Sequence, residues 1–159
     1  MNDIAAVSRS LSSLLRELIN GPRPDQFTWV LNPNPESGLI PSLQRLSSAE
    51  ASVKPRLDRA CIAAHVHHIR YSLQLLNRWA QGENAYQDAD WEQSWQVESV
   101  TEEEWSQLIE GLRHEADKWI QQVHLRRDWD ADSMTGAIAS AAHVAYHLGS
   151  IRQMLGTGS

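Results

Sequence analysis

Four segments of the 159-residue chain have apolar residues at every third or fourth position, and this spacing constrains the fold more than any other feature. Such a repeat predicts amphipathic helices, because it places the apolar side chains on one face. We expect helices from Asp3 to Asn20, from Pro55 to Gln81, from Thr101 past Val123, and from Ser133 to Leu155. The alternation of apolar and polar residues that marks a half-buried strand is not found in the sequence.

Two long connections join these helices. Residues 21–42 contain five of the six prolines, and proline fixes φ and removes a backbone donor, so we expect a non-helical crossover followed by a short helical piece over 43–50. Residues 83–100, called the acidic segment below, combine acidic and aromatic side chains without a helical period and are expected to form a long loop. The sequence therefore predicts an all-α fold, a four-helix bundle with long crossover connections, formed by residues 1–159 as a single domain.

Cap residues mark two of the helix ends. Thr101 and Glu104 have the spacing of a capping box, in which each side chain accepts a hydrogen bond from the other residue's backbone N–H. Asp132 or Ser133 is expected to cap the last helix, and Gly156 is expected to end it.

Charge and cysteine content exclude several classes of protein. The net charge of −6, without a cluster of Lys or Arg, argues against a nucleic-acid binder. Cys61 is the single cysteine, which excludes an intrachain disulfide and fits a reducing cytoplasm. The N-terminus lacks the pattern of a signal peptide, and no apolar run is long enough for a membrane span, so we expect a cytoplasmic protein without a membrane partner.

The candidate chemistry lies in the histidines. His143 and His147 are four residues apart, so they share one face of the last helix, and two imidazoles at this spacing are a frequent clamp for Zn, Ni or Fe(II). The other residues of that face are small, which leaves room for a metal ion; they are Gly136, Ala139, Ser140 and Ser150. The alternative is an ordinary pair of histidines that are satisfied by hydrogen bonds.

The second helix offers further ligands. His65 and His68 share a face, and either could complete a site with His143 and His147, whereas His67 points away and is expected on the surface. Cys61 lies one turn before His65, as a buried apolar residue or as a soft fourth ligand. Three nitrogen ligands leave one coordination position open, which is typical of catalytic metal sites.

The two histidine motifs together resemble a known family. His65-Val66-His67-His68 on one helix and His143-Val144-Ala145-Tyr146-His147-Leu148-Gly149 on the last resemble the DinB-like superfamily of four-helix metalloproteins, which includes the bacillithiol and mycothiol S-transferases. This resemblance implies that His65, His143 and His147 are the metal ligands and that His68 supports them. It also implies a homodimer.

The resemblance leads to a functional hypothesis. A divalent ion on three imidazoles would lower the pKa of a bound water or activate a low-molecular-weight thiol, which would then attack a small electrophile; the chain would be a thiol S-transferase or a hydrolase. Trp91 and Trp95 would cover the site as a lid or simply anchor the acidic segment, and Ser150 is a candidate supporting or substrate-side residue. The alternatives are a non-catalytic, stress-related homodimeric metal-binding module and a metal-free helical protein.

Overall fold

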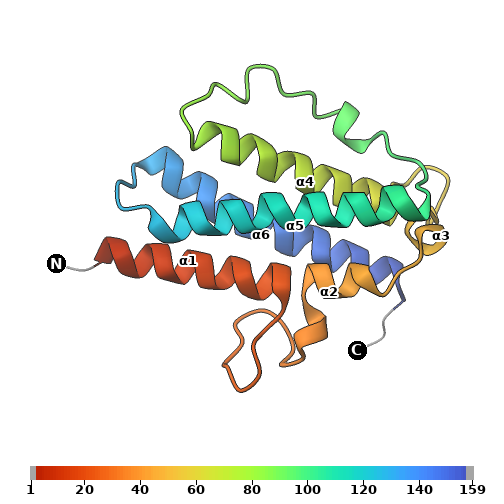
Figure 1. The fold of residues 1–159 in the computed structure, drawn as a ribbon, viewed down its shortest axis with the longest axis horizontal. Coiled ribbons are helices and arrows are strands. Elements are labelled where there is room, and N and C mark those ends of the chain that lie inside the picture. Colours follow the sequence, from red (N-terminus) through yellow and green to blue (C-terminus); the bar gives the residue numbers. More distant parts are fainter. Residues whose placement is uncertain (1–2, 157–159) are drawn as a thin grey trace.

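The computed structural model describes residues 3–156, and within this range it consists of helices and connections, without strands (Figure 1). The predicted all-α class is therefore confirmed. The α-helices are α1 (Asp3–Asn20), α2 (Leu39–Gln44), α3 (Ser48–Ala51), α4 (Ile62–Trp79), α5 (Glu102–Leu125) and α6 (Ala131–Met154), and two 3-10 turns are η1 (Pro35–Ser37) and η2 (Gln93–Trp95).

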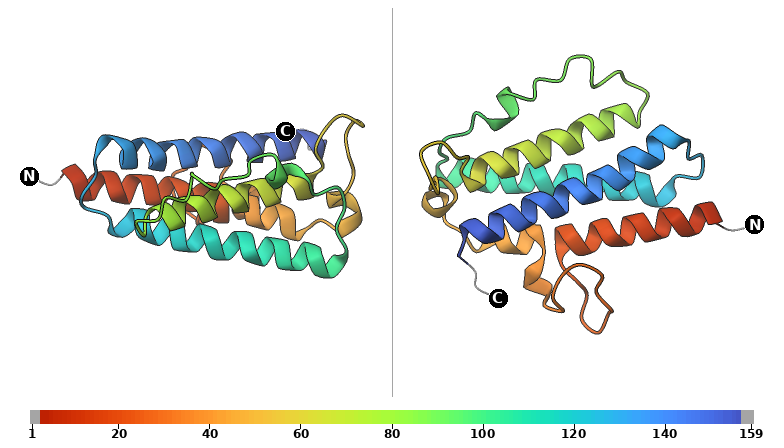
Figure 2. Two further views of the ribbon diagram at one scale, coloured as in Figure 1. Left: turned by 90° about the horizontal axis from the view of Figure 1, so that it is seen from above. Right: turned by 180° about the vertical axis from the view of Figure 1, so that it is seen from behind.

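The four helices of 18 residues or more lie side by side (Figures 1 and 2). Both α5 and α6 pack against α1 and against α4, so each long helix has two long neighbours. Their apolar stripes meet in one core, as the periodicity requires. Its fully buried members include Leu15, Leu18, Ile19, Ile69, Leu73, Leu112, Trp119 and Ile120.

The second long helix starts later than the sequence predicts. It begins at Ile62, with Cys61 as its N-cap residue, and not near Pro55. The reason is that residues 55–59 contain one large apolar side chain, that of Leu57, and it is 97% exposed, so helix formation there would gain little packing. The single short helix expected over 43–50 is instead two helices, because α2 ends at Gln44 and Ser47 caps the start of α3.

The capping box at the start of α5 is confirmed, since Thr101 and Glu104 form both of its hydrogen bonds. The predicted start of α6 is wrong by two residues. Asp130 is the N-cap, and its side chain accepts the backbone N–H of Ser133 at 2.7 Å, while the Ser133 hydroxyl oxygen accepts the Asp130 N–H at 3.0 Å. Ser133 is therefore the third residue of α6, and it forms a capping box with Asp130.

A buried carboxylate holds the connection between α1 and α2. Glu17 is 8% exposed, and its carboxylate accepts the backbone N–H groups of Trp29, Val30 and Leu31 at 2.8–3.1 Å. At the base of this connection Gly21 has a φ of +83° and lies so close to Pro35 that a side chain would collide with the Pro35 carbonyl. The connection therefore folds back on the end of α1 in a fixed conformation (Figure 1).

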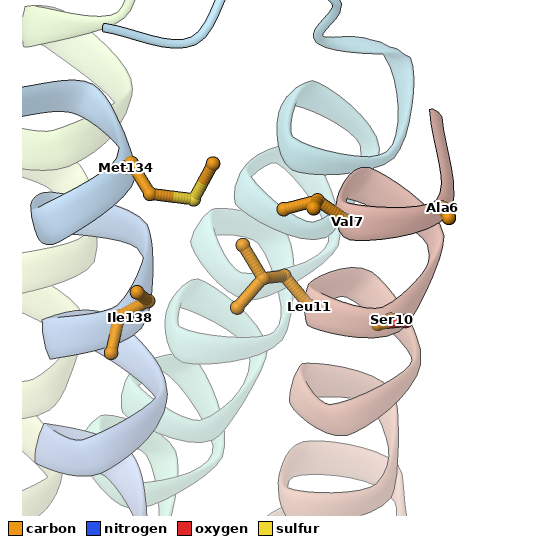
Figure 3. A pocket seen from close by; sticks show the side chains of 6 residues that line it. All are labelled: Ala6, Val7, Ser10, Leu11, Met134 and Ile138. Carbon is orange, nitrogen blue, oxygen red and sulfur yellow. The ribbon is translucent and has the colours of Figure 1, made fainter. Parts of the chain in front are cut away.

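An apolar groove of about 410 Å³ separates the first half of α1 from the first half of α6. Val7 and Leu11 on α1 face Met134 and Ile138 on α6 across it (Figure 3). Ile138 is 54% exposed, so the groove opens to solvent. Within residues 3–156, no helix combines the length and the apolar character that crossing a bilayer requires.

Candidate metal centre

Helices α4 and α6 bring three histidines together in a group that could hold a metal ion, called the histidine cluster below. Its members are His68 on α4 and His143 and His147 on α6, and one ring nitrogen of each lies within 4.8 Å of the other two. The Nε2 atom of His143 lies 3.2 Å from Nε2 of His68 and 2.9 Å from Nε2 of His147. His68 and His147 are buried, and His143 is partly exposed.

A serine hydroxyl lies within hydrogen-bond distance of His68 and favours one tautomer of its ring. The Ser94 hydroxyl donates its single hydrogen to the carbonyl oxygen of Trp91 at 2.7 Å, and its oxygen also lies 2.7 Å from Nδ1 of His68. Because a hydroxyl has one hydrogen, the second contact is favourable only if His68 Nδ1 carries a proton and donates it. Nε2 of His68, which faces the other two rings, then carries a lone pair.

The same arrangement occurs at His143. Ser72 donates its hydroxyl hydrogen to the carbonyl oxygen of Ile69 at 2.8 Å, and its oxygen lies 3.3 Å from Nδ1 of His143. This arrangement favours the His143 tautomer with its proton on Nδ1 and a lone pair on Nε2. Metal-ligating histidines characteristically donate their other N–H group in this way, because the bond fixes the tautomer and the orientation of the ring.

These tautomers create a site for a cation. The lone pairs of His68 and His143 face each other at 3.2 Å, a contact that is repulsive unless a positive charge lies between them. A proton on Nε2 of His147 can satisfy the 2.9 Å contact with His143 but leaves the contact between His68 and His143 without one. A single cation among the three nitrogens satisfies both contacts, so the donor set fits a metal ion such as Zn, Ni or Fe(II).

Burial keeps the cluster uncharged. Desolvation lowers the pKa of His147 to about 3 and that of His68 to about 4, and repulsion from neighbouring imidazoles adds to the shift. Desolvation also lowers the pKa of His143 and of His65. The neutral imidazole is the form that binds metals, so these rings are ready to act as ligands at neutral pH.

His65, which the family resemblance implies as a ligand, lies at the outer edge of the cluster. Its Nδ1 atom is 2.9 Å from Nδ1 of His147, whereas the other ring nitrogen of His147, Nε2, faces His143. His68 occupies the third position among the described ligand atoms. In this arrangement His65 supports His147 in the same way that Ser94 supports His68 and Ser72 supports His143.

The acidic segment runs along α4 (Figures 1 and 2), and it contacts the cluster through Ser94 and Trp95. The ring of Trp95 stacks on His68, with centroids 4.1 Å apart, and also contacts His65 and His147. Trp91 lies farther out, 5.8 Å from His68, and is 42% exposed. The two tryptophans of the expected lid are therefore unequal, since Trp95 is in direct contact with the rings and Trp91 forms an outer layer.

His67 does not behave as the sequence predicts. It points away from the cluster, but it is half-buried and its Nδ1 lies 2.8 Å from the carbonyl oxygen of Ser94. The interpretation as a solvated surface residue was wrong, because that side of α4 is covered by the acidic segment. His67 and His68 together bind both the backbone and the side chain of Ser94.

Cys61 and Ser150 lie apart from the cluster. The Cys61 thiol is fully buried and contacts the carbonyl oxygens of Val97 and Glu98 at 3.5 and 3.6 Å, so it packs against the end of the acidic segment. The Ser150 hydroxyl donates to the carbonyl oxygen of Tyr146 on its own helix at 3.0 Å. Cys61 does not belong to the group of described residues that could hold a metal ion.

Sequence reasoning did not identify Ser72 and Ser94 as functional residues. Ser72 lies four residues after His68 on the same face of α4, so helical spacing could have indicated it. Ser94 lies in a segment without a period, and the sequence gives no signal for its contact with His68. No protein-family model, curated protein or solved structure matches the chain, so the assignment of the site depends on this geometry.

Proposed function

We propose that the chain is a metal-dependent enzyme with a DinB-like four-helix bundle, and that it acts as a thiol S-transferase or a hydrolase. One observation carries the proposal: three imidazole nitrogens converge, and hydrogen bonds from Nδ1 of His68 and His143 aim the lone pairs of these two rings at one point. Three nitrogen ligands leave a coordination position open for a substrate atom, which distinguishes a catalytic site from a closed structural one.

The residues around the cluster have separate roles in this proposal. His68, His143 and His147 hold a divalent ion, which as a Lewis acid favours the deprotonated form of a water or of a low-molecular-weight thiol. Ser94 and Ser72 orient two of the rings, and His65 orients the third. Trp95 excludes water from one side and gives a small apolar electrophile a surface to lie on.

Metal content tests the first half of the proposal. The protein is purified without a histidine tag, and the bound metal of the wild type and of His143→Ala is measured by elemental analysis. We expect one divalent ion per wild-type chain and a strong loss in the variant, because His143 contacts both other rings. A wild type that folds normally and binds none of Zn, Ni or Fe would refute the proposal.

A matched pair of variants decides between the two histidines of α4. His68→Ala removes a nitrogen of the described cluster, whereas His65→Ala removes a neighbour of His147 Nδ1. We expect His68→Ala to abolish stoichiometric binding and His65→Ala to weaken it about tenfold to a hundredfold, the usual cost of losing a supporting group. The opposite order would return the ligand role to His65, as the family resemblance implies.

Measurement of turnover tests the second half of the proposal, that the chain is a thiol S-transferase or a hydrolase. The metal-loaded protein is incubated with a reactive electrophile and, in separate reactions, glutathione, bacillithiol or mycothiol, and also with an ester substrate and no thiol. We expect conjugation with one thiol or hydrolysis of the ester, and we expect His143→Ala to be inactive. Inactivity of the metal-loaded wild type in every reaction would exclude these activities and favour the second candidate function.

The second candidate is a non-catalytic homodimeric module, and the surface of α6 supports it. Residues 133–151 contain no charged side chain, although Ile138, Ala139, Ala142 and Tyr146 are exposed on this helix. An exposed helix face without charges, next to the apolar groove of Figure 3, is typical of a surface that packs against a second copy. Light scattering is expected to show a dimer that Ile138→Arg dissociates; a monomeric wild type would remove this candidate.

A further inference from the structure

A polar cavity, separate from the apolar groove of Figure 3, lies at the end of α1, where the connection to α2 folds back. Its volume is about 520 Å³, within the range of small-molecule pockets. The described wall comes from α1, from residues 21–24, 26, 27 and 29, and from the last turn of α5, and it includes no residue of α4 or α6, which carry the histidine cluster. The side chains that matter most for its chemistry are Arg9, Arg16, Arg23, Phe27, Trp29 and His124.

The wall carries positive charge that the protein does not neutralise. Among the described side chains of residues 4–156, Arg9, Arg16 and Arg23 form no ion pair within 4.0 Å, as is also true of Arg59, Arg70, Lys118 and Arg127. Glu17 is the one acidic residue of the wall, and its carboxylate is already taken by three backbone N–H groups. What distinguishes Arg9, Arg16 and Arg23 is that they line one cavity, and three guanidinium groups in one cavity suit an anionic ligand.

Two aromatic rings line the same cavity as these arginines. Phe27 is 79% exposed and Trp29 is 77% exposed, and their rings meet edge to face with centroids 5.0 Å apart. The bond from the Trp29 backbone N–H to Glu17 fixes the connection that presents them. Exposed rings held in position next to arginines are the usual platform on which a planar group stacks.

We propose that this cavity binds a small phosphorylated ligand with a planar ring, of the nucleotide type. Guanidinium groups pair with phosphate oxygens through two parallel hydrogen bonds, so Arg16 and its neighbours take the phosphate end. Trp29 and Phe27 take the ring. The small size of the cavity and the acidic character of the chain favour a free nucleotide over a nucleic-acid strand.

Isothermal titration calorimetry of the full chain with ADP, adenosine and inorganic phosphate tests the proposal. We expect ADP to bind with a dissociation constant below about 1 mM, and adenosine and phosphate each to bind at least about tenfold more weakly. Absence of ADP binding would overturn the proposal. Binding of phosphate as tightly as ADP would overturn it as well, because the rings would then contribute nothing.

Three variants locate the site. Arg16→Gln and Trp29→Ala change exposed side chains, so both should fold, and each should weaken ADP binding by about tenfold. The matched control is Arg113→Gln, which removes an arginine on α5 that pairs with Glu110 outside the cavity and should leave binding unchanged. Equal losses in all three variants would indicate non-specific attraction and refute the site.

The histidine variant separates this inference from the metal centre. His143→Ala should bind ADP as the wild type does, because His143 lies on α6 and does not line the cavity. Loss of ADP binding in His143→Ala would refute a separate site.

Discussion

Replacing Ser94 with alanine tests whether a hydroxyl outside the ligand set controls the metal centre. Ser94 is 1% exposed, and its oxygen lies 2.7 Å from His68 Nδ1 and 2.7 Å from the Trp91 carbonyl. The substitution leaves a buried N–H group and a buried carbonyl without partners and frees the His68 ring to change tautomer. The loss of such a supporting group lowers metal affinity about tenfold to a hundredfold, which corresponds to about 1.4–2.7 kcal/mol.

Substitutions of two further serines should change the metal affinity by smaller amounts or not at all. Ser72 makes a longer bond, 3.3 Å from His143 Nδ1, so Ser72→Ala should weaken metal binding by less than Ser94→Ala. Ser150→Ala is the control, because its hydroxyl bonds only to the backbone of its own helix, and it should leave the affinity unchanged. Ser94→Thr keeps the hydroxyl and should restore most of the affinity.

The assay is a competition titration of Co²⁺ against a chromophoric chelator at pH 7.5, with the d–d spectrum of the ion reporting its coordination. We expect the order wild type and Ser150→Ala first, then Ser72→Ala, then Ser94→Ala. If the wild type binds Co²⁺ and Ser94→Ala binds it within a factor of two, the inference that Ser94 sets the His68 tautomer is refuted.

Three further predictions concern stability and use urea unfolding of the metal-free protein. Burial lowers the pKa of His147 to about 3 and that of His68 to about 4, so between pH 6.5 and these values the unfolded chain binds more protons than the folded chain. The free energy of unfolding should therefore stay constant above about pH 6.5 and fall as the pH is lowered further, by less than about 1.4 kcal/mol per pH unit for each ring. A free energy of unfolding that does not change down to pH 5 would contradict this. Glu17→Ala leaves three backbone N–H groups without their acceptor and should cost about 2–4 kcal/mol, whereas the exposed Asp88→Ala should cost under about 0.5; equal effects would refute the role of the buried carboxylate. Trp119→Phe removes the indole N–H that donates at 2.9 Å to a buried hydroxyl on α6 and should cost about 1–3 kcal/mol, and an unchanged midpoint would show that the bond contributes nothing.

Features that depend on local spacing could be predicted from the sequence. The period of the apolar residues gave the long helices, and the spacing of Thr101 and Glu104 gave a cap that the structure confirms. The pairing of His143 and His147 on one face also follows from helical geometry alone, and the structure places their Nε2 atoms 2.9 Å apart.

The position of α4 relative to α6 could not be predicted in the same way. His65 and His68 lie on one broad face of α4, and which of them faces His143 depends on how the helix is rotated about its axis. That rotation is set by the packing of Val66, Ile69 and Leu73 in the core, which involves several helices at once. Spacing within one helix therefore left both choices open.

The contacts of the acidic segment could not be predicted from the sequence either. The bonds of His67 and His68 to Ser94 join residues that are 27 and 26 positions apart, and Ser94 lies in a segment without a periodic pattern. The late start of α4 is a related case, because Pro55 can begin a helix and only the lack of packing around Leu57 shows that it does not.

The stacking of Trp95 on His68, together with the bonds of Ser94, ties the acidic segment to the histidine cluster energetically. Suppose that a molecule binds this segment and changes the affinity of the cluster for an ion by some factor. By thermodynamic reciprocity, the ion must then change the affinity of the segment for that molecule by the same factor. An ion held by the cluster would therefore alter, through this segment, how the surface of the protein binds other molecules, without any change of fold.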